Sequence, residues 1–236
     1  MFILSGIPVS PGIAIGYAYI LAHALGEIEP YLIPKNKVTQ EIKRFNNSVR
    51  NLHLELVNLK NELKKNKMIE YGSFIDIQLS ILKDPKISED PKKIIKDTLT
   101  NAEWALKIQM DEIINKFNKI NNTYIKERKN DVYQVCENLI KYIIGHQSHK
   151  ASNNRNQIII AHAISPSDAI KFKNTNNLAF ITDIGGTTSH TAILAKSINI
   201  PSVVGIQNAK QLINHDDLLI VDGGHGCILV NPPNNV

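Results

Sequence analysis

Apolar residues recur at alternating steps of four and three over positions 38–63. The series comprises Val38, Ile42, Phe45, Val49, Leu52, Leu56, Leu59 and Leu63. An α-helix makes one turn in about 3.6 residues, so this spacing brings the whole series onto one face. The pattern predicts an amphipathic helix of roughly 40 Å whose apolar face packs against other helices.

Two further helices are indicated by the residues that end them. One is predicted over about Ser73 to Leu82, because the Asp84-Pro85 step disfavours helical continuation. The other is predicted over about Tyr124 to Ile144, because Gly145 can adopt the left-handed conformation that often follows a helix.

A fourth helix is predicted from a capping signal. Thr100 and Glu103 have the spacing of a capping box, in which each side chain bonds the backbone N–H of the other residue. This helix would turn its large apolar residues toward a core, namely Trp104, Ile108, Ile113, Phe117 and Ile120. Four antiparallel helices with short connections predict an all-α four-helix bundle.

The rest of the chain alternates between strand and helix patterns. Short β-branched runs predict strands at Gln157–Ala161, Leu178–Thr182, Ser202–Val204, Leu218–Asp222 and Ile228–Val230. Helical segments are expected near Ser167–Phe172 and Ser189–Ile198, between these strands. The opening residues 5–16 are punctuated by Gly and Pro and lead to a further strand near Tyr17–Leu21. This alternation predicts an α/β layer structure.

The charged residues divide the chain into two domains. Asp, Glu, Lys and Arg crowd between residues 21 and 147 and are sparse on either side. We therefore expect an α/β domain built from residues 1–21 and 148–236, with a helical bundle of residues 22–147 inserted into it.

Bulk properties narrow the class of protein. No apolar run approaches the roughly 18 residues that span a bilayer, and the N-terminus lacks the basic region of a signal peptide, so we expect a cytoplasmic protein without membrane insertion. Cys136 and Cys227 are far apart, which supports neither a disulfide framework nor a thiolate metal site. The net charge is +5, but acidic residues interrupt the basic ones, so no nucleic-acid partner is expected.

The segment Thr182 to Lys196 carries the chemistry. A strand ends at Thr182, Gly185 and Gly186 make a tight turn, and His190 then lies in the first turn of a helix. Free N–H groups and the helix dipole favour an anion there and keep the imidazole neutral and nucleophilic. A phosphoryl group on His190 could be held by these N–H groups and by the hydroxyls of Thr187, Thr188, Ser189 or Thr191. The local pattern also fits a histidine that merely caps a helix or lies on the surface.

A longer motif favours the chemical interpretation. GGTTSHTAILAKSINIPSVVG closely resembles the phosphohistidine signature of phosphoenolpyruvate-utilising swivelling domains, which occur in enzyme I of the sugar phosphotransferase system and in pyruvate phosphate dikinase. Residues 5–16, YIKERKNDV at 124–132 and the segment Val230 to Pro232 resemble enzyme I in the same order. With the inserted bundle, the chain resembles the N-terminal domain of enzyme I.

The resemblance implies a phosphoryl relay. His190 would take the group from phosphoenolpyruvate through Nε2 and pass it to the histidine-containing phosphocarrier protein. In the family, phosphoenolpyruvate and Mg²⁺ bind a C-terminal barrel that this chain lacks, so no cofactor or metal is expected here and Mg²⁺ only with that barrel. Dimer contacts belong to the same barrel, so we expect this chain to be monomeric.

The resemblance also implies that the carrier docks on the helical bundle. The residues it assigns to this surface are Glu70, Phe74, Gln78, Leu79, Leu82, Asp84 and Arg128. At helical spacing, Phe74, Leu79 and Leu82 could equally be core, and Arg128 could instead pair with Asp131.

The sequence departs from the family pattern in three places. Thr187 stands where enzyme I commonly has an arginine that contacts phosphate in bidentate fashion, so phosphoryl transfer is expected to be slower. Ala169 stands where a hydroxyl residue often contacts the histidine, and Ser165 or Ser167 could substitute for it. The docking face, usually acidic, is basic here because of Lys64, Lys65, Lys67, Lys83 and Lys86.

Other functions fit the sequence less well. The histidines that could bind a metal (His146, His149, His162, His215 and His225) have no acidic partner at ligand spacing. A hydrolase using Ser189 and His190 is disfavoured, because adjacent helical residues point in different directions. The main alternative is a noncatalytic docking or regulatory module of the same fold, and a nitrogen-branch homologue of enzyme I is a third.

Overall fold

The computed structural model describes residues 1–21, 28–65, 72–122, 128–145, 156–164, 168, 177–186, 192, 195–196 and 199–233. Contacts divide the chain into two compact units, Met1–His23 with Lys150–Val236 and Ala24–His149. The predicted domain boundaries involve residues 22, 147 and 148, which lie outside the described residues.

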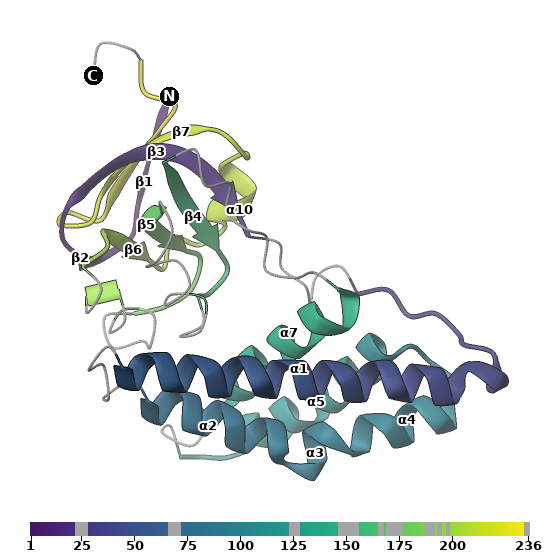
Figure 1. Ribbon diagram of the computed structural model, residues 1–236. Coiled ribbons are helices and arrows are strands. Elements are labelled where there is room, and N and C mark those ends of the chain that lie inside the picture. Colours follow the sequence, from purple (N-terminus) through teal and green to yellow (C-terminus); the bar gives the residue numbers. More distant parts are fainter. Residues whose placement is uncertain are drawn as a thin grey trace. The chain divides into compact units, whose positions relative to one another are not determined.

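The first unit is built on one mixed sheet, shown in the upper part of Figure 1. Its strands are β1 (Phe2–Ser5), β2 (Ile7–Ser10), β3 (Ile13–Ile20), β4 (Gln157–Ala161), β5 (Asn177–Thr182), β6 (Ser202–Val204), β7 (Leu218–Asp222) and β8 (Cys227–Val230). They lie in the order β1-β8-β7-β3-β4-β5-β6-β2. The contacts of β4 with β3 and β5, and of β5 with β6, are parallel, while the other pairs are antiparallel. The predicted α/β class and the strands from β4 to β8 are confirmed.

The strands share a common core, to which β3 and β7 contribute alternate residues, whereas β4 and β6 are buried on both faces. Along β3, Ala14 and Ala18 are buried whereas Ile13 and Ile15 are 70% and 55% exposed. Ala14 pairs in register with Val221 of β7, which is also buried. This alternation follows from the two-residue period of a strand. The short helix α10 (Ala209–Leu212), which was not predicted, adds Ala209 to the core.

The second unit is helical (Figure 1). Its elements are η2 (Lys35–Lys37), α1 (Val38–Lys65), α2 (Gly72–Lys83), α3 (Pro85–Ser88), α4 (Asp90–Thr98), α5 (Ala102–Asn118) and α7 (Lys129–Ile144). Helix α1 packs on α2 and α7, and α5 packs on α4 and α7. Gly145 ends α7 with φ 80°, as predicted, because glycine adopts this left-handed conformation without a steric penalty. Residues 123–127, where α7 was expected to begin, lie outside the described residues.

The long helix α1 confirms most of its predicted apolar face. Phe45, Leu52, Leu56, Leu59 and Leu63 are buried. Nearer the N-terminus, however, Glu41 and Ser48 are buried while Val38, Ile42 and Val49 keep partial exposure. The buried polar residues indicate that hydrogen bonds, as well as apolar packing, hold this end of the helix.

Helix α5 corrects two predictions. Its N-cap residue is Asn101, whereas Thr100 pairs in a β-bridge with Leu32, so the predicted capping box does not form. Its buried residues are Ala102, Glu103, Ala105, Leu106, Gln109 and Met110. Ile108 and Ile120 are exposed, and Trp104, Ile113 and Phe117 are only partly buried. The buried face of α5 thus combines two small alanines with Leu106 and Met110, and it differs from the face predicted from the largest apolar residues.

Helix α4 was not predicted. Pro91 lies in its first turn, where proline needs no N–H partner and its ring favours the helical φ. No helix in the described part of the chain is long and apolar enough to cross a membrane.

Candidate functional site

The carboxyl ends of β4, β5 and β6 lie along one edge of the sheet, because these strands run parallel. In α/β sheets, ligands commonly bind at this edge. The residues that directly follow these strands are His162, Asp183 and Gly205.

Asp183 connects all three strand ends. Its backbone N–H donates to the carbonyl of Ala161 at 3.1 Å, and its own carbonyl accepts from Gln207 at 3.2 Å. Its carboxylate Oδ2 lies 3.5 Å from His162 Nδ1, and Oδ1 accepts from the backbone N–H of Lys210 at 3.4 Å. The predicted site did not include Asp183 or His162, because their contact depends on the pairing of β4 with β5.

Gly185 and Gly186 follow shortly after this edge. Gly185 has φ 132°, a conformation that other residues rarely adopt. Gly205, with φ 72°, faces it, since a Cβ added to Gly205 would lie 3.3 Å from the carbonyl oxygen of Gly185. A Cβ added to Gly186 would meet nothing within 4 Å. The backbone of Gly185 therefore packs against the loop after β6, while Asp183 and Ile184 form a bend before it. The tight turn expected at the two glycines stays a prediction, because residues 187–191 lie outside the described part of the chain.

The central histidine and its hydroxyl neighbours lie outside the described residues. These are Thr187, Thr188, Ser189, His190 and Thr191, so their predicted roles stay predictions. Within the expected helix of residues 189–198, Ala192, Ala195 and Lys196 are helical, and both alanines are buried. The N–H of Ile200 donates to the carbonyl of Ala195 at 3.2 Å.

The second segment near the site is described at one position. Asp168 is helical and partly buried, in agreement with the helix expected near 167–172. Ser165, Ser167 and Ala169, the residues weighed as contacts of the histidine, lie outside the described residues.

The residues assigned to carrier docking divide between core and surface. Gln78 and Leu82 are 4% and 1% exposed, so they cannot touch a partner directly, and the core alternative holds for Leu82. Phe74 and Leu79 are partly exposed, and Asp84 is exposed. Glu70 lies outside the described residues.

Two docking residues also have structural roles. Asp84 caps α3, since its Oδ1 accepts from the backbone N–H of Lys86 at 2.8 Å. Arg128 Nη1 lies 3.1 Å from Asp131 Oδ2, which is the alternative considered for this arginine.

Two histidines have acidic partners that the sequence did not indicate. His162 faces Asp183, and His225 Nδ1 lies 2.8 Å from Asp222 Oδ2. Hydrogen bonds from the backbone and ring of His225 hold the pKa of Asp222 below its usual value. Among the residues described, no three His, Cys, Asp or Glu side chains are grouped so that they could hold a metal ion.

Comparison with known proteins assigns the family. Residues 5–128 match the family model described as PEP-utilising enzyme, N-terminal, and residues 153–226 match that of the PEP-utilising enzyme mobile domain. The phosphoenolpyruvate-protein phosphotransferase of Cupriavidus necator is 37% identical, over 98% of this chain and 41% of the relative. That of Listeria monocytogenes is 32% identical, over 97% of this chain and 40% of the relative.

Solved structures agree with this assignment. An NMR structure of enzyme I (nEIt) has 32% identity and a TM-score of 0.71, over 98% of this chain and 94% of that one. The N-terminal domain of "Enzyme 1 - Nitrogen" has 20% identity and a TM-score of 0.69, over 97% and 94%, which is a likeness of fold alone. The chain thus belongs to the PEP-utilising enzyme family, as an N-terminal region of the enzyme I (phosphoenolpyruvate-protein phosphotransferase) type.

Proposed function

We propose that His190 carries a phosphoryl group between phosphoenolpyruvate and the histidine-containing phosphocarrier protein. The observation that supports this most directly is the position of Gly185 and Gly186. These glycines follow β5 at the carboxyl edge of three parallel strands, and the motif with His190 comes directly after them in the sequence. The mobile-domain match over residues 153–226 includes the whole motif.

For phosphoryl transfer, the protein mainly has to position the reacting groups and stabilise the charge on the phosphoryl oxygens. A neutral imidazole nitrogen attacks phosphorus, the bond from phosphorus to the donor oxygen breaks, and an N-phosphohistidine forms. In the second step, the carrier's histidine attacks the same phosphorus and His190 leaves as neutral imidazole. N–H groups at the start of the helix and the nearby hydroxyls would stabilise the charge on the phosphoryl oxygens.

The donor site is proposed to lie elsewhere in a longer protein. The chain spans 41% and 40% of the length of the two relatives described above. Phosphoenolpyruvate and Mg²⁺ would bind in the remaining part. The carrier would dock on the helical unit, where Phe74, Leu79 and Asp84 keep exposed surface.

The test is phosphorylation of this chain by its phosphorylated carrier protein. Intact mass and phosphorus NMR should show one acid-labile phosphate on the wild type and on His225→Gln, and none on His190→Ala. His225 is a matched control because its side chain is 83% exposed. Binding of the carrier without transfer to the wild type would instead support the noncatalytic docking module.

A further inference from the structure

The helical unit contains a groove that shares only Leu82 and Lys83 with the face expected to dock the carrier. It lies between α1 and the junction of α2 with α3, and its volume is about 460 Å³. This volume is in the range of small-molecule sites, which hold roughly 300–1,000 Å³. All the residues that line it belong to the helical unit.

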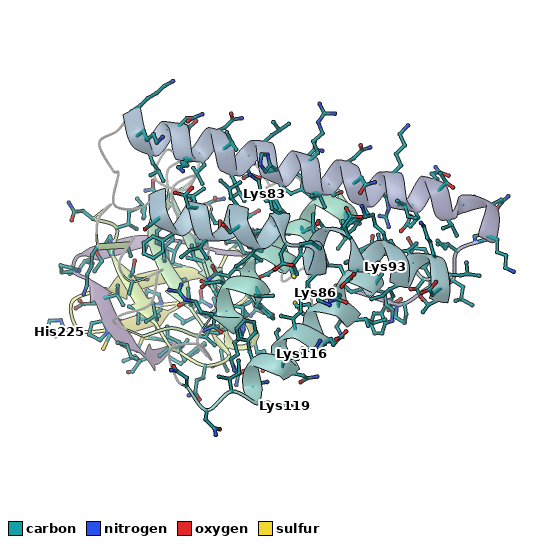
Figure 2. All side chains as sticks on the ribbon, turned by 90° about the horizontal axis from the view of Figure 1, so that it is seen from below. Lys83, Lys86, Lys93, Lys116, Lys119 and His225 are labelled. Atoms are coloured by element: carbon teal, nitrogen blue, oxygen red, sulfur yellow. The ribbon has the colours of Figure 1, made fainter. Side chains whose placement is uncertain are left out.

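The groove is cationic. Arg50 and His53 of α1 and Lys83 at the end of α2 line it, and none of its lining residues is acidic. Figure 2 shows Lys83 at the end of α2 that lies beside α1. A second cavity of about 520 Å³ on the same unit includes Glu41 together with Lys37 and Lys43, so its charge is mixed. The absence of a lining carboxylate distinguishes the groove from that cavity.

The acidic residues at the starts of α3 and α4 are engaged with other groups. Asp84 accepts from the backbone N–H of Lys86, and Glu89 pairs with Lys92. Asp90 pairs with both Lys86 and Lys93. Within the described parts of the chain, no carboxylate pairs with Arg50 or Lys83, so their charges remain available to a ligand.

The groove also has an apolar side. Leu54 of α1, which is 49% exposed, and the buried Leu82 of α2 both line it. A half-exposed leucine next to two cations favours a ligand that is both charged and apolar. Arginine suits the charged end, because its planar guanidinium binds carboxylate or phosphate through two hydrogen bonds.

We propose that this groove binds a small organic anion with an apolar body, whose phosphate or carboxylate contacts Arg50 and Lys83 while the body lies against Leu54. Phosphate and carboxylate heads share this chemistry, and the experiment distinguishes them. The groove residues belong to the helical unit and His190 to the other unit, and the proposal does not depend on phosphoryl transfer.

The test is a methyl NMR titration of the full 236-residue chain with hexyl phosphate, hexanoate, hexanol and inorganic phosphate. One or both organic anions should shift the Leu54 and Leu82 methyl signals saturably, and the tighter of the two identifies the preferred head. Hexanol lacks the charged head and inorganic phosphate lacks the apolar body. Each should therefore bind at least about tenfold more weakly than the better organic anion.

Variants assign the binding to these residues. Arg50→Gln combined with Lys83→Gln should weaken binding by about tenfold or more, whereas Lys43→Gln on the same helix should leave it unchanged. Arg50 and Lys83 are exposed, so the double variant should fold, which its unfolding midpoint verifies. Equal binding of hexanol, an unchanged affinity in the double variant, or no saturable shift with either anion would overturn the proposal.

Discussion

Arg44 of α1 and Glu103 of α5 form a bidentate ion pair, with Nη1 to Oε1 and Nη2 to Oε2 both at 2.7 Å. Arg44 also donates to the carbonyl of Ile143, near the end of α7, at 3.0 Å. Its neighbour Glu41 accepts from the backbone N–H of Ala102, the first residue of α5, at 2.7 Å. One arginine therefore joins three helices at the end of the unit where α1 buries polar residues.

Replacing Arg44 should destabilise the helical unit. Arg44→Gln leaves Glu41 and Glu103 buried without their cation, and we expect the free energy of unfolding to fall by about 2–4 kcal/mol. Because the arginine side chain is 33% exposed, we expect the loss to stay below the largest values for fully buried ion pairs. Urea unfolding followed by fluorescence of Trp104, the single tryptophan, measures the change. Arg50→Gln, on the exposed side of the same helix, should change it by less than about 0.5 kcal/mol, and equal effects would refute the assignment.

The same pair should make stability depend on pH. Burial alone would raise the pKa of Glu103, but hydrogen bonds from Arg44 outweigh this and hold that pKa below its usual value of 4.5. The contribution of the pair is therefore full above about pH 4.5 and is lost as the pH falls through the lower pKa of the folded state.

The measurement is the difference in unfolding free energy between wild type and Arg44→Gln at several pH values. This difference should be largest near about pH 7 and shrink below about pH 4, because Glu103 becomes neutral in both proteins. A difference that stayed constant across this range would mean that the carboxylate charge contributes nothing.

Local patterns predicted the helix α1 because its apolar period is long and unbroken. They failed at α5, where the bulky residues Trp104 and Ile108 suggested the wrong face. Glu103 is buried there because it forms an ion pair with Arg44. This partner lies 59 positions earlier in the chain. No local sequence pattern contains that pairing. The buried polar cluster at this end of the helical unit could therefore not be predicted from the sequence.

At the candidate site, too, local features could be predicted from the sequence and contacts between distant residues could not. The end of β5 at Thr182, just before the two glycines, was predicted from the sequence and is confirmed. The contact of Asp183 with His162 was not predicted, because it depends on β4 and β5 pairing in parallel with Ala161 opposite Thr182. Gly205 was missed for the same reason, although a glycine after a strand is a visible signal of close packing.

Gly205→Ala should loosen the carboxyl edge of the sheet. The left-handed φ of 72° and the approach of a Cβ to within 3.3 Å of the Gly185 carbonyl should cost about 1–3 kcal/mol. Hydrogen exchange of the Ile206 N–H, which bonds Thr182, reports this loss locally. Gly186→Ala is the matched control for stability because the space around it is open. Equal protection in both variants would show that the Gly205 contact is not tight.

The two cysteines should differ strongly in reactivity. Cys136 is fully buried, and desolvation raises the pKa of its thiol to about 12, so almost no thiolate exists near neutral pH. Cys227 is only partly buried. Iodoacetamide should therefore label Cys227 in the folded protein and Cys136 only in urea, as peptide mass analysis would show. Labelling of Cys136 at a rate similar to Cys227 would indicate that the helical unit opens readily.

The buried face of α5 can be tested by a pair of substitutions. Ala105 is 0% exposed in a helix that packs on α7, whereas Ile108 is 39% exposed. Ala105→Leu forces extra carbons into a filled interface and should lower the free energy of unfolding by about 1–3 kcal/mol. Ile108→Ala removes surface carbons and should change it by less than about 1 kcal/mol. Trp104 fluorescence in urea measures the free energy of unfolding of both variants. A larger loss for Ile108→Ala than for Ala105→Leu would support the face first predicted from the large apolar residues. The comparison is informative because both changes favour or preserve helix formation, so any difference reports packing and not helix propensity.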